Sequence, residues 1–202
     1  MPELRIRFEK LGKAAYLSHL DIRRTFQRAF LRAGVQLKHS EGFNPHPKIS
    51  ISQPLQLGCE SVCETLDASV LSGPEDLKSA LNASLPEGLR VVDVYPAVNK
   101  PSLVRYALWH LSFDSPELAA QVYGILQQDS LVIEKKTKRG SSQLDLSQHL
   151  ELKGLEGNAL DVLLSASEPT VNTGDVTKAL NGPVPRKCRR LQLYTQNMVE
   201  FQ

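Results

Sequence analysis

Hydrophobic and charged residues alternate at the beginning of the chain. The alternating apolar residues are Leu4, Ile6 and Phe8. A period of two is typical of a strand that buries one face. The period then becomes that of a helix, whose apolar face comprises Ile22, Phe26, Ala29 or Phe30, and Ala33. Ser18, with Asp21 three residues later, predicts the start of this helix, and Gly34 predicts its end.

The rest of the first hundred residues predicts three more strands and a second helix. Ile49 and Ile51 alternate with serines in the second strand, which follows a loop rich in Gly, Pro and His. We expect the other two strands at residues 62–70 and 89–95, with a helix at 74–85 between them. The order βαββαβ is that of the ferredoxin-like pattern.

The second half of the chain repeats this order of elements without repeating the sequence. The pattern predicts strands at residues 106–113, 131–137, 159–166 and 188–194. It predicts helices at residues 116–128 and 173–180. Residues 138–158 are expected to connect the two middle strands, with a helical turn near residues 145–150.

These patterns together predict an α+β protein with two ferredoxin-like (βαββαβ) domains in tandem. The first domain is expected at residues 1–98 and the second at residues 104–202. Residues 99–103 form the connector between them, next to two prolines that interrupt regular structure.

Composition narrows the class of protein. Of the 202 residues, 41% are hydrophobic and 23% are charged, which is ordinary for a globular chain and excludes wholesale disorder. No stretch approaches about 18 uninterrupted apolar residues, so no membrane span is expected. The charged N-terminus lacks the apolar core of a signal peptide, and three cysteines cannot all pair within the chain. The sequence therefore predicts a cytoplasmic protein.

Charge is distributed unevenly along the chain. The net charge is +2, yet residues 1–50 hold ten Lys and Arg residues against four Asp and Glu residues. Within that region Arg24, Arg28 and Arg32 are spaced by four, which places them in one stripe on the predicted helix. Because each guanidinium is a fixed fork of donors, the stripe is suited to bind phosphates or an acidic partner. The alternative is an ordinary solvated helix face.

A second candidate site is the loop Gly42–Lys48, in which two prolines bracket a histidine. Prolines restrict the backbone, so this loop is suited to present Asn44, His46 and Lys48 to a ligand. The alternative is a turn that only directs the following strand.

A third candidate is a patch at the start of the first helix. It comprises Ser18, His19, Asp21, Glu60 and Ser61. Glu60 and Ser61 are included in this patch because the βαββαβ order places the helix start near the turn before residue 62. Neighbouring positions at a helix start point in different directions, so a Ser–His–Asp hydrolase is not expected. His46 should lie at the opposite end of the helix, unless residues 35–47 fold back along it.

Motifs for cofactors and metals are weak or missing in the sequence. Cys59 and Cys63 form a single C-x3-C, whereas metal sites usually combine paired short spacings. The chain has no C-x3-C-x2-C triplet for the iron–sulfur cluster of a radical SAM enzyme, and no glycine-rich phosphate loop. We therefore predict no catalytic residue, no metal ligand and no cofactor for this chain.

Several spaced motifs resemble those of a known family. They are Ser18-His19-Leu20-Asp21, Arg24, Arg28-Ala29, the run from Ser40 to Pro47, the run from Pro54 to Gly58, Glu60-Ser61 and Glu64. Together they are similar to the radical SAM-linked family of uncharacterised proteins, DUF2344. Members occur alone or fused after a B12-binding radical SAM enzyme domain, and their genes often neighbour those of an E/G-type ribonuclease and ribosomal proteins. The resemblance implies an accessory role near RNA or ribosome maturation.

The leading functional hypothesis is a non-catalytic module that binds RNA, or an RNA-containing substrate, for a partner radical SAM enzyme. One alternative is a protein-docking module for that enzyme or for a ribosomal protein, in which Phe43 would matter more than the arginines. A second alternative is a metal-independent endoribonuclease that uses His19 or His46 as general acid or base.

Overall fold

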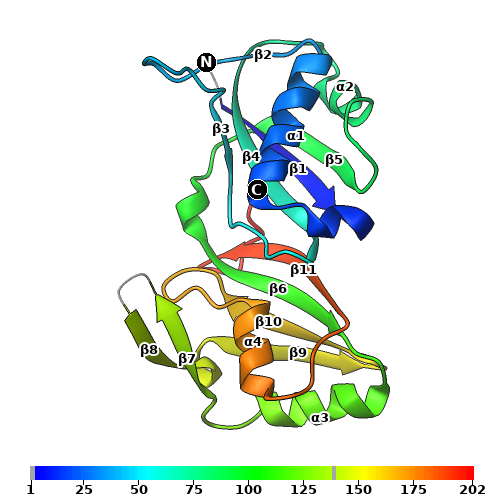
Figure 1. Cartoon of the computed structure of the whole chain (residues 1–202), viewed down its shortest axis with the longest axis vertical. Coiled ribbons are helices and arrows are strands. Elements are labelled where there is room, and N and C mark those ends of the chain that lie inside the picture. The colour runs from blue at the N-terminus through cyan, green and yellow to red at the C-terminus, as the bar shows by residue number, and fades with distance from the viewer. Residues whose placement is uncertain (1–2, 138–139) are drawn as a thin grey trace. The chain divides into compact units, whose positions relative to one another are not determined.

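A computed structural model of the chain describes residues 3–137 and 140–202 (Figure 1). The fold is mixed α+β, with a mainly sheet core and few helices. The chain divides into two compact units, the described residues up to Pro101 together with Gln202, and Ser102–Phe201.

The first unit contains an antiparallel sheet with two helices. Its elements are β1 (Glu3–Lys10), η1 (Gly12–Tyr16), α1 (His19–Arg32), β2 (Gln36–Leu37), β3 (Ile49–Ile51), β4 (Glu60–Ser72), α2 (Leu77–Asn82) and β5 (Leu89–Pro96). The strand order is β5-β1-β4, and both β2 and β3 pair with β4. The predicted strands and helices follow one another in this unit in the expected order, except that the helix expected at residues 74–85 is shorter and that η1 and β2 were not predicted.

Two short pieces of strand lie along β4. The second piece, β3, is the strand predicted around Ile49, whereas β2 was not predicted. Leu37 of β2 pairs with Val70, and Ile49 of β3 pairs with Ala68, two residues closer to the start of β4. The backbone between the two pieces leaves the sheet as a loop at residues 38–48 (Figure 1). The sheet therefore continues past a loop that projects from it.

Local side-chain chemistry defines where α1 begins. Ser18 Oγ accepts a hydrogen bond from Asp21 N at 3.1 Å, and Asp21 Oδ2 accepts one from Ser18 N at 3.3 Å. This reciprocal capping box satisfies backbone donors that the first helical turn leaves without partners. Gly34, with φ at +70°, follows the C-terminal cap, as the sequence predicted.

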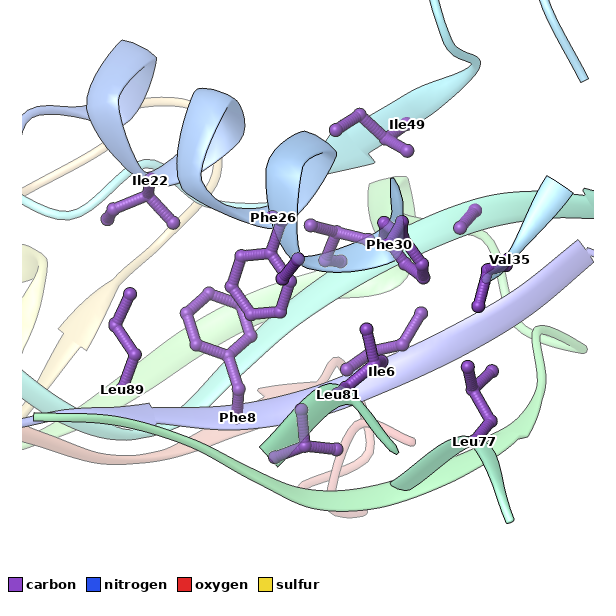
Figure 2. Packing of buried hydrophobic residues seen from close by; sticks show 14 of the residues in the cluster. Ile6, Phe8, Ile22, Phe26, Phe30, Val35, Ile49, Leu77, Leu81 and Leu89 are labelled. Carbon is purple, nitrogen blue, oxygen red and sulfur yellow. The ribbon is translucent and has the colours of Figure 1, made fainter. Parts of the chain in front are cut away.

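An aromatic cluster anchors α1 to the sheet. The ring centroids of Phe8 and Phe26 lie 4.7 Å apart, and those of Phe26 and Phe30 lie 6.4 Å apart (Figure 2). Ile22 and Ala29 complete the buried face of the helix. The core expected from the periodicity is thus confirmed, and it fixes the rotation of α1 about its axis.

A buried ion pair lies on the polar side of β1. Arg5 is fully buried, and its Nε and Nη2 donate to the two carboxylate oxygens of Asp67 at 2.6 and 2.7 Å. The same guanidinium also donates to the backbone carbonyls of Asn99 and Gln202. The alternation in β1 predicted that only its apolar face is buried, but Arg5 on the other face is buried as well.

The second unit also contains antiparallel strands. Its elements are β6 (Val104–Ser112), α3 (Pro116–Leu126), β7 (Val132–Thr137), β8 (Gly140–Asp145), η3 (Leu146–Gln148), β9 (Leu150–Glu156), β10 (Ala159–Ser165), α4 (Thr173–Leu180) and β11 (Lys187–Thr195), and the short helix η2 (Pro101–Leu103) precedes β6. The strand order is β11-β6-β10-β9, and β7 pairs with β8 in a separate hairpin.

The prediction for residues 131–158 was partly wrong. The strand expected at 131–137 belongs to the hairpin, and β9 occupies the place beside β10 that was expected for it. The segment expected to be a connection contains β8, β9 and the helical turn η3. Strand β9 is at the sheet edge and largely exposed, so its sequence carries many charged and polar residues and lacks a continuous buried pattern.

We expect Phe26→Ala to destabilise the first unit strongly. The substitution removes a fully buried ring that contacts Phe8, and such truncations reduce the free energy of unfolding by about 3–5 kcal/mol. Urea unfolding provides the measurement. Leu20→Ala, on the same helix but exposed, is the matched control and should change this free energy by less than about 0.5 kcal/mol. Equal effects of the two substitutions would contradict this account of the core.

We expect Asp67→Asn to be costly because it leaves the buried charge of Arg5 without its counter-ion. Breaking a buried pair in this way reduces the free energy of unfolding by about 3–5 kcal/mol. Glu9→Gln provides the comparison, since Glu9 pairs with the exposed Arg90 and such pairs contribute about 0–1 kcal/mol. A loss of less than about 1 kcal/mol for Asp67→Asn in urea unfolding would refute the importance of the buried pair.

Candidate functional site

A pocket of about 430 Å³ lies between α1 and the segment that follows it. Its lining residues are Arg24, Gln27, Arg28, Phe30, Leu31, Val35, Leu37, His39 and Pro47. Residues 24, 27, 28 and 31 follow the spacing i, i+3, i+4 and i+7, so they share one side of α1. This side is next to the buried face that holds Phe26, which brings it to the border of the core.

The opposite wall is formed by β2 and the base of the loop at residues 38–48. Lys48 N donates to Lys38 O at 2.7 Å, and Ser40 N donates to His46 O at 2.8 Å. His46 N also donates to Ser40 Oγ at 3.0 Å. These bonds close the loop at its base and hold Pro47 against the pocket.

The pocket combines an apolar wall with cationic side chains. Phe30, Val35 and Leu37 are buried, whereas Leu31 is 78% exposed at the edge of the pocket. Arg24 and Arg28 are exposed, and neither guanidinium hydrogen-bonds to the part of the chain that the structure describes. None of the described lining residues carries a carboxylate. This combination suits a ligand with a negative charge and an apolar surface.

His39 adds a polar group to the wall that faces α1. Its Nδ1 lies 3.0 Å from Leu37 O, and a carbonyl oxygen accepts only, so Nδ1 carries the hydrogen when this bond forms. In the neutral ring Nε2 is then an acceptor. The pocket thus offers an acceptor as well as guanidinium donors.

The structure separates Arg32 from the other two arginines of the predicted stripe. Arg32 Nη2 donates to Ser84 O at 2.5 Å, and its side chain does not line the pocket. The bond ties the last turn of α1 to the segment after α2. Of the three arginines spaced by four, two therefore line the pocket, and the third contacts another part of the fold.

The loop residues predicted to bind a ligand lie close in sequence to the pocket but outside its lining. Asn44, His46 and Lys48 are exposed, and only Pro47 of this run lines the pocket. Because Pro47 shares the pocket with α1, the chain after the helix folds back along it. The sequence left open that residues 35–47 fold back along the helix. This path brings the base of the loop to the arginines.

The patch predicted at the helix start is mostly used for internal contacts. Hydrogen bonds from the Ser18 hydroxyl and then from its backbone N–H hold the pKa of Asp21 below its usual range. Glu60 is buried and accepts from Gly12 N at 3.0 Å. Ser61 is also buried, and its Oγ accepts from the N–H of Cys63 at 3.2 Å. Glu60 and Ser61 are therefore inaccessible from solvent, whereas Ser18, His19 and Asp21 remain half-buried at the helix start.

The two histidines considered as acid and base belong to different parts of the unit. His19 is the first residue of α1, whereas His46 lies in the loop at residues 38–48, which follows that helix in the chain. No hydrogen bond or ion pair of the described residues joins these two side chains.

Within residues 3–137 and 140–202, no group of three or more His, Cys, Asp or Glu side chains is placed to hold a metal ion. No helix in the described part of the chain has the length and apolar character needed to cross a membrane.

The sequence prediction missed part of the pocket lining. It selected Arg24 and Arg28 but not Gln27, Leu31 or His39. The helical spacing around the arginines was a signal for Gln27 and Leu31. No signal in the sequence placed His39 opposite the helix, because that position depends on the path of the loop.

A family model matches most of this chain, and a chain of a solved structure is similar to it. A search of the curated proteins finds no significant match. A chain in the crystal structure of a Cbf5-Nop10-Gar1 complex is similar at 14% sequence identity with a TM-score of 0.45, over 94% of this chain and 48% of that chain. This chain therefore spans about half the length of the chain that it matches. The model of a family described as uncharacterized proteins conserved in bacteria matches residues 3–175, and the chain belongs to this family, DUF2344.

Proposed function

We propose that this chain is a non-catalytic accessory module that binds RNA, or an RNA-containing substrate, for a partner radical SAM enzyme in the cytoplasm. The observation that carries the proposal is the pocket beside α1, where Arg24 and Arg28 lie next to an apolar wall. RNA offers a phosphate at every nucleotide and a flat base with apolar faces. The phosphate matches the two arginines, and the apolar faces of the base match the apolar wall.

The charge around the pocket supports an anionic ligand. The pocket lies within the basic segment 1–50, and Lys38 and Lys48 at the base of the loop are exposed. Side chains spaced by four on a helix are about 5–6 Å apart at Cβ, so Arg24 and Arg28 can bind one phosphate or two neighbouring ones. Phosphate contacts of this kind supply affinity and position rather than sequence specificity.

The proposed radical SAM partner rests on the family resemblance. The chain itself lacks the cysteine triplet that holds the iron–sulfur cluster of such enzymes. In this proposal the radical chemistry belongs to the partner, in a separate chain or a fused domain. The DUF2344 module contributes the recognition of the substrate.

We also infer that the two units are ferredoxin-like domains in tandem. The order β5-β1-β4 with β3 beside β4 supports this for the first unit. In the second unit, the order β11-β6-β10-β9 gives the same arrangement once the β7–β8 hairpin is treated as an insertion. A sheet of this type provides a rigid support for the helix that carries the two arginines.

We expect the variant Arg24→Ala/Arg28→Ala to bind short single-stranded RNA more weakly and with less dependence on salt. Each lost phosphate contact reduces the slope of log K against log salt concentration by about 0.7 for a single strand, so the double variant should lose about 1.4. Fluorescence anisotropy titrations between about 50 and 200 mM salt measure both quantities.

Arg32→Ala is the matched control because it removes the same charge from the same helix. Its guanidinium contacts Ser84 O rather than the pocket, so the salt slope should stay close to that of the unchanged protein. Equal losses for all three arginines would indicate a general basic helix face. Unchanged affinity in the double variant would overturn the proposed RNA contact.

Protein docking is a second candidate function, favoured by one observation. Phe43, in the projecting loop, is fully exposed. An exposed aromatic ring on a loop closed at its base is a typical anchor for a partner protein. The same loop would then dock the enzyme while the pocket stays available for RNA.

Affinity purification of the tagged chain from its native lysate separates the two functions. We expect a defined RNA to be recovered without nuclease and to be lost with Arg24→Ala/Arg28→Ala but not with Phe43→Ser. A protein partner that survives nuclease and is lost with Phe43→Ser would instead establish docking through the loop. Recovery of that partner alone, with no enriched RNA, would contradict the RNA-binding proposal.

A further inference from the structure

We infer that the pocket beside α1 takes a single nucleotide unit, with its phosphate on Arg24 and Arg28 and its base against the wall that includes Leu31. This inference deepens the proposed RNA-binding function by naming the unit that occupies the pocket. A nucleotide pocket of this kind contacts the base as well as the phosphate, whereas a simple basic surface attracts phosphates alone.

The first argument is the exposed leucine. Leu31 is 78% exposed although it lies one helical turn after Arg28, on the same side of α1. An apolar side chain beside two cations contributes nothing to phosphate binding. It would contribute to binding when a flat apolar surface covers it, as a base would.

The second argument is the arrangement of the lining. The arginines come from α1, whereas the buried apolar residues Val35 and Leu37 come from the segment after the helix. A ligand that contacts both sides needs a charged end and an apolar end. A nucleotide has a charged phosphate at one end and a base with apolar faces at the other, whereas inorganic phosphate has only the charge.

The third argument is the size and the polar groups of the pocket. A volume of about 430 Å³ lies within the usual range for small-molecule sites. Gln27 has no hydrogen bond to the described residues, and His39 directs Nδ1 to Leu37 O, which leaves Nε2 for a ligand. Amide and imidazole groups of this kind contact the polar edge of a base.

The test uses three small probes on the full chain: AMP, ribose 5-phosphate, which lacks the base, and adenosine, which lacks the phosphate. NMR titrations measure their dissociation constants. We expect AMP to bind at least about tenfold more tightly than either of the other probes, because only AMP engages both sides of the pocket.

Two variants on α1 test the two halves of the ligand separately, one by removing an apolar contact and one by removing a charge. Leu31→Ser should weaken AMP severalfold and leave ribose 5-phosphate unchanged. Arg28→Ala should weaken AMP and ribose 5-phosphate but leave adenosine unchanged. Both positions are exposed, so the variants should fold, and their spectra without ligand verify this. Arg32→Ala is the control and should leave all three dissociation constants unchanged.

The outcomes distinguish this inference from the proposed function. If ribose 5-phosphate binds as tightly as AMP and Leu31→Ser has no effect, the pocket is an anion site and the inference is wrong, while RNA binding can still hold. If RNA binds through the arginines but AMP does not bind, the inference is also wrong. If AMP binds as expected but RNA does not, the nucleotide pocket stands and the proposed RNA function falls.

Discussion

The contact between Phe8 and Phe26 is the interaction on which the candidate site depends. The two rings fix α1 on β1 and determine which side of the helix faces the core. Once that side is set, the side with Arg24 and Arg28 must lie at the border between core and solvent. The apolar wall and the cations therefore meet because of how the helix packs, and the pocket needs no special backbone conformation in α1.

Much of the first unit could be predicted because its signals are local. Ser18 and Asp21 lie three residues apart, so the capping box that begins α1 is visible in the sequence. The buried positions of that helix follow its own period, and the two pocket arginines follow from the same geometry. The strand order could then be expected from the order of elements alone.

The features that the sequence did not predict depend on residues far apart in the chain. Arg32 binds the carbonyl of Ser84, 52 positions away, and nothing in the spacing of the arginines indicates it. Arg5 is buried because Asp67 supplies its counter-charge from another strand. Strand β9 was missed because an edge strand buries little surface and so carries a weak pattern. The path of the loop, which brings His39 to α1, depends equally on tertiary packing.

The hydrogen bond between Lys38 and Lys48 closes the loop between them, so the loop can be changed separately in protein engineering. The strands on either side already have their register on β4, so the length of the loop is not needed to set it. Doubling the length of a flexible loop costs only about 0.6 kcal/mol in closure entropy. The exposed stretch around Phe43 is therefore a place where a peptide tag or a small reporter domain can be inserted while the sheet and the pocket wall keep their positions.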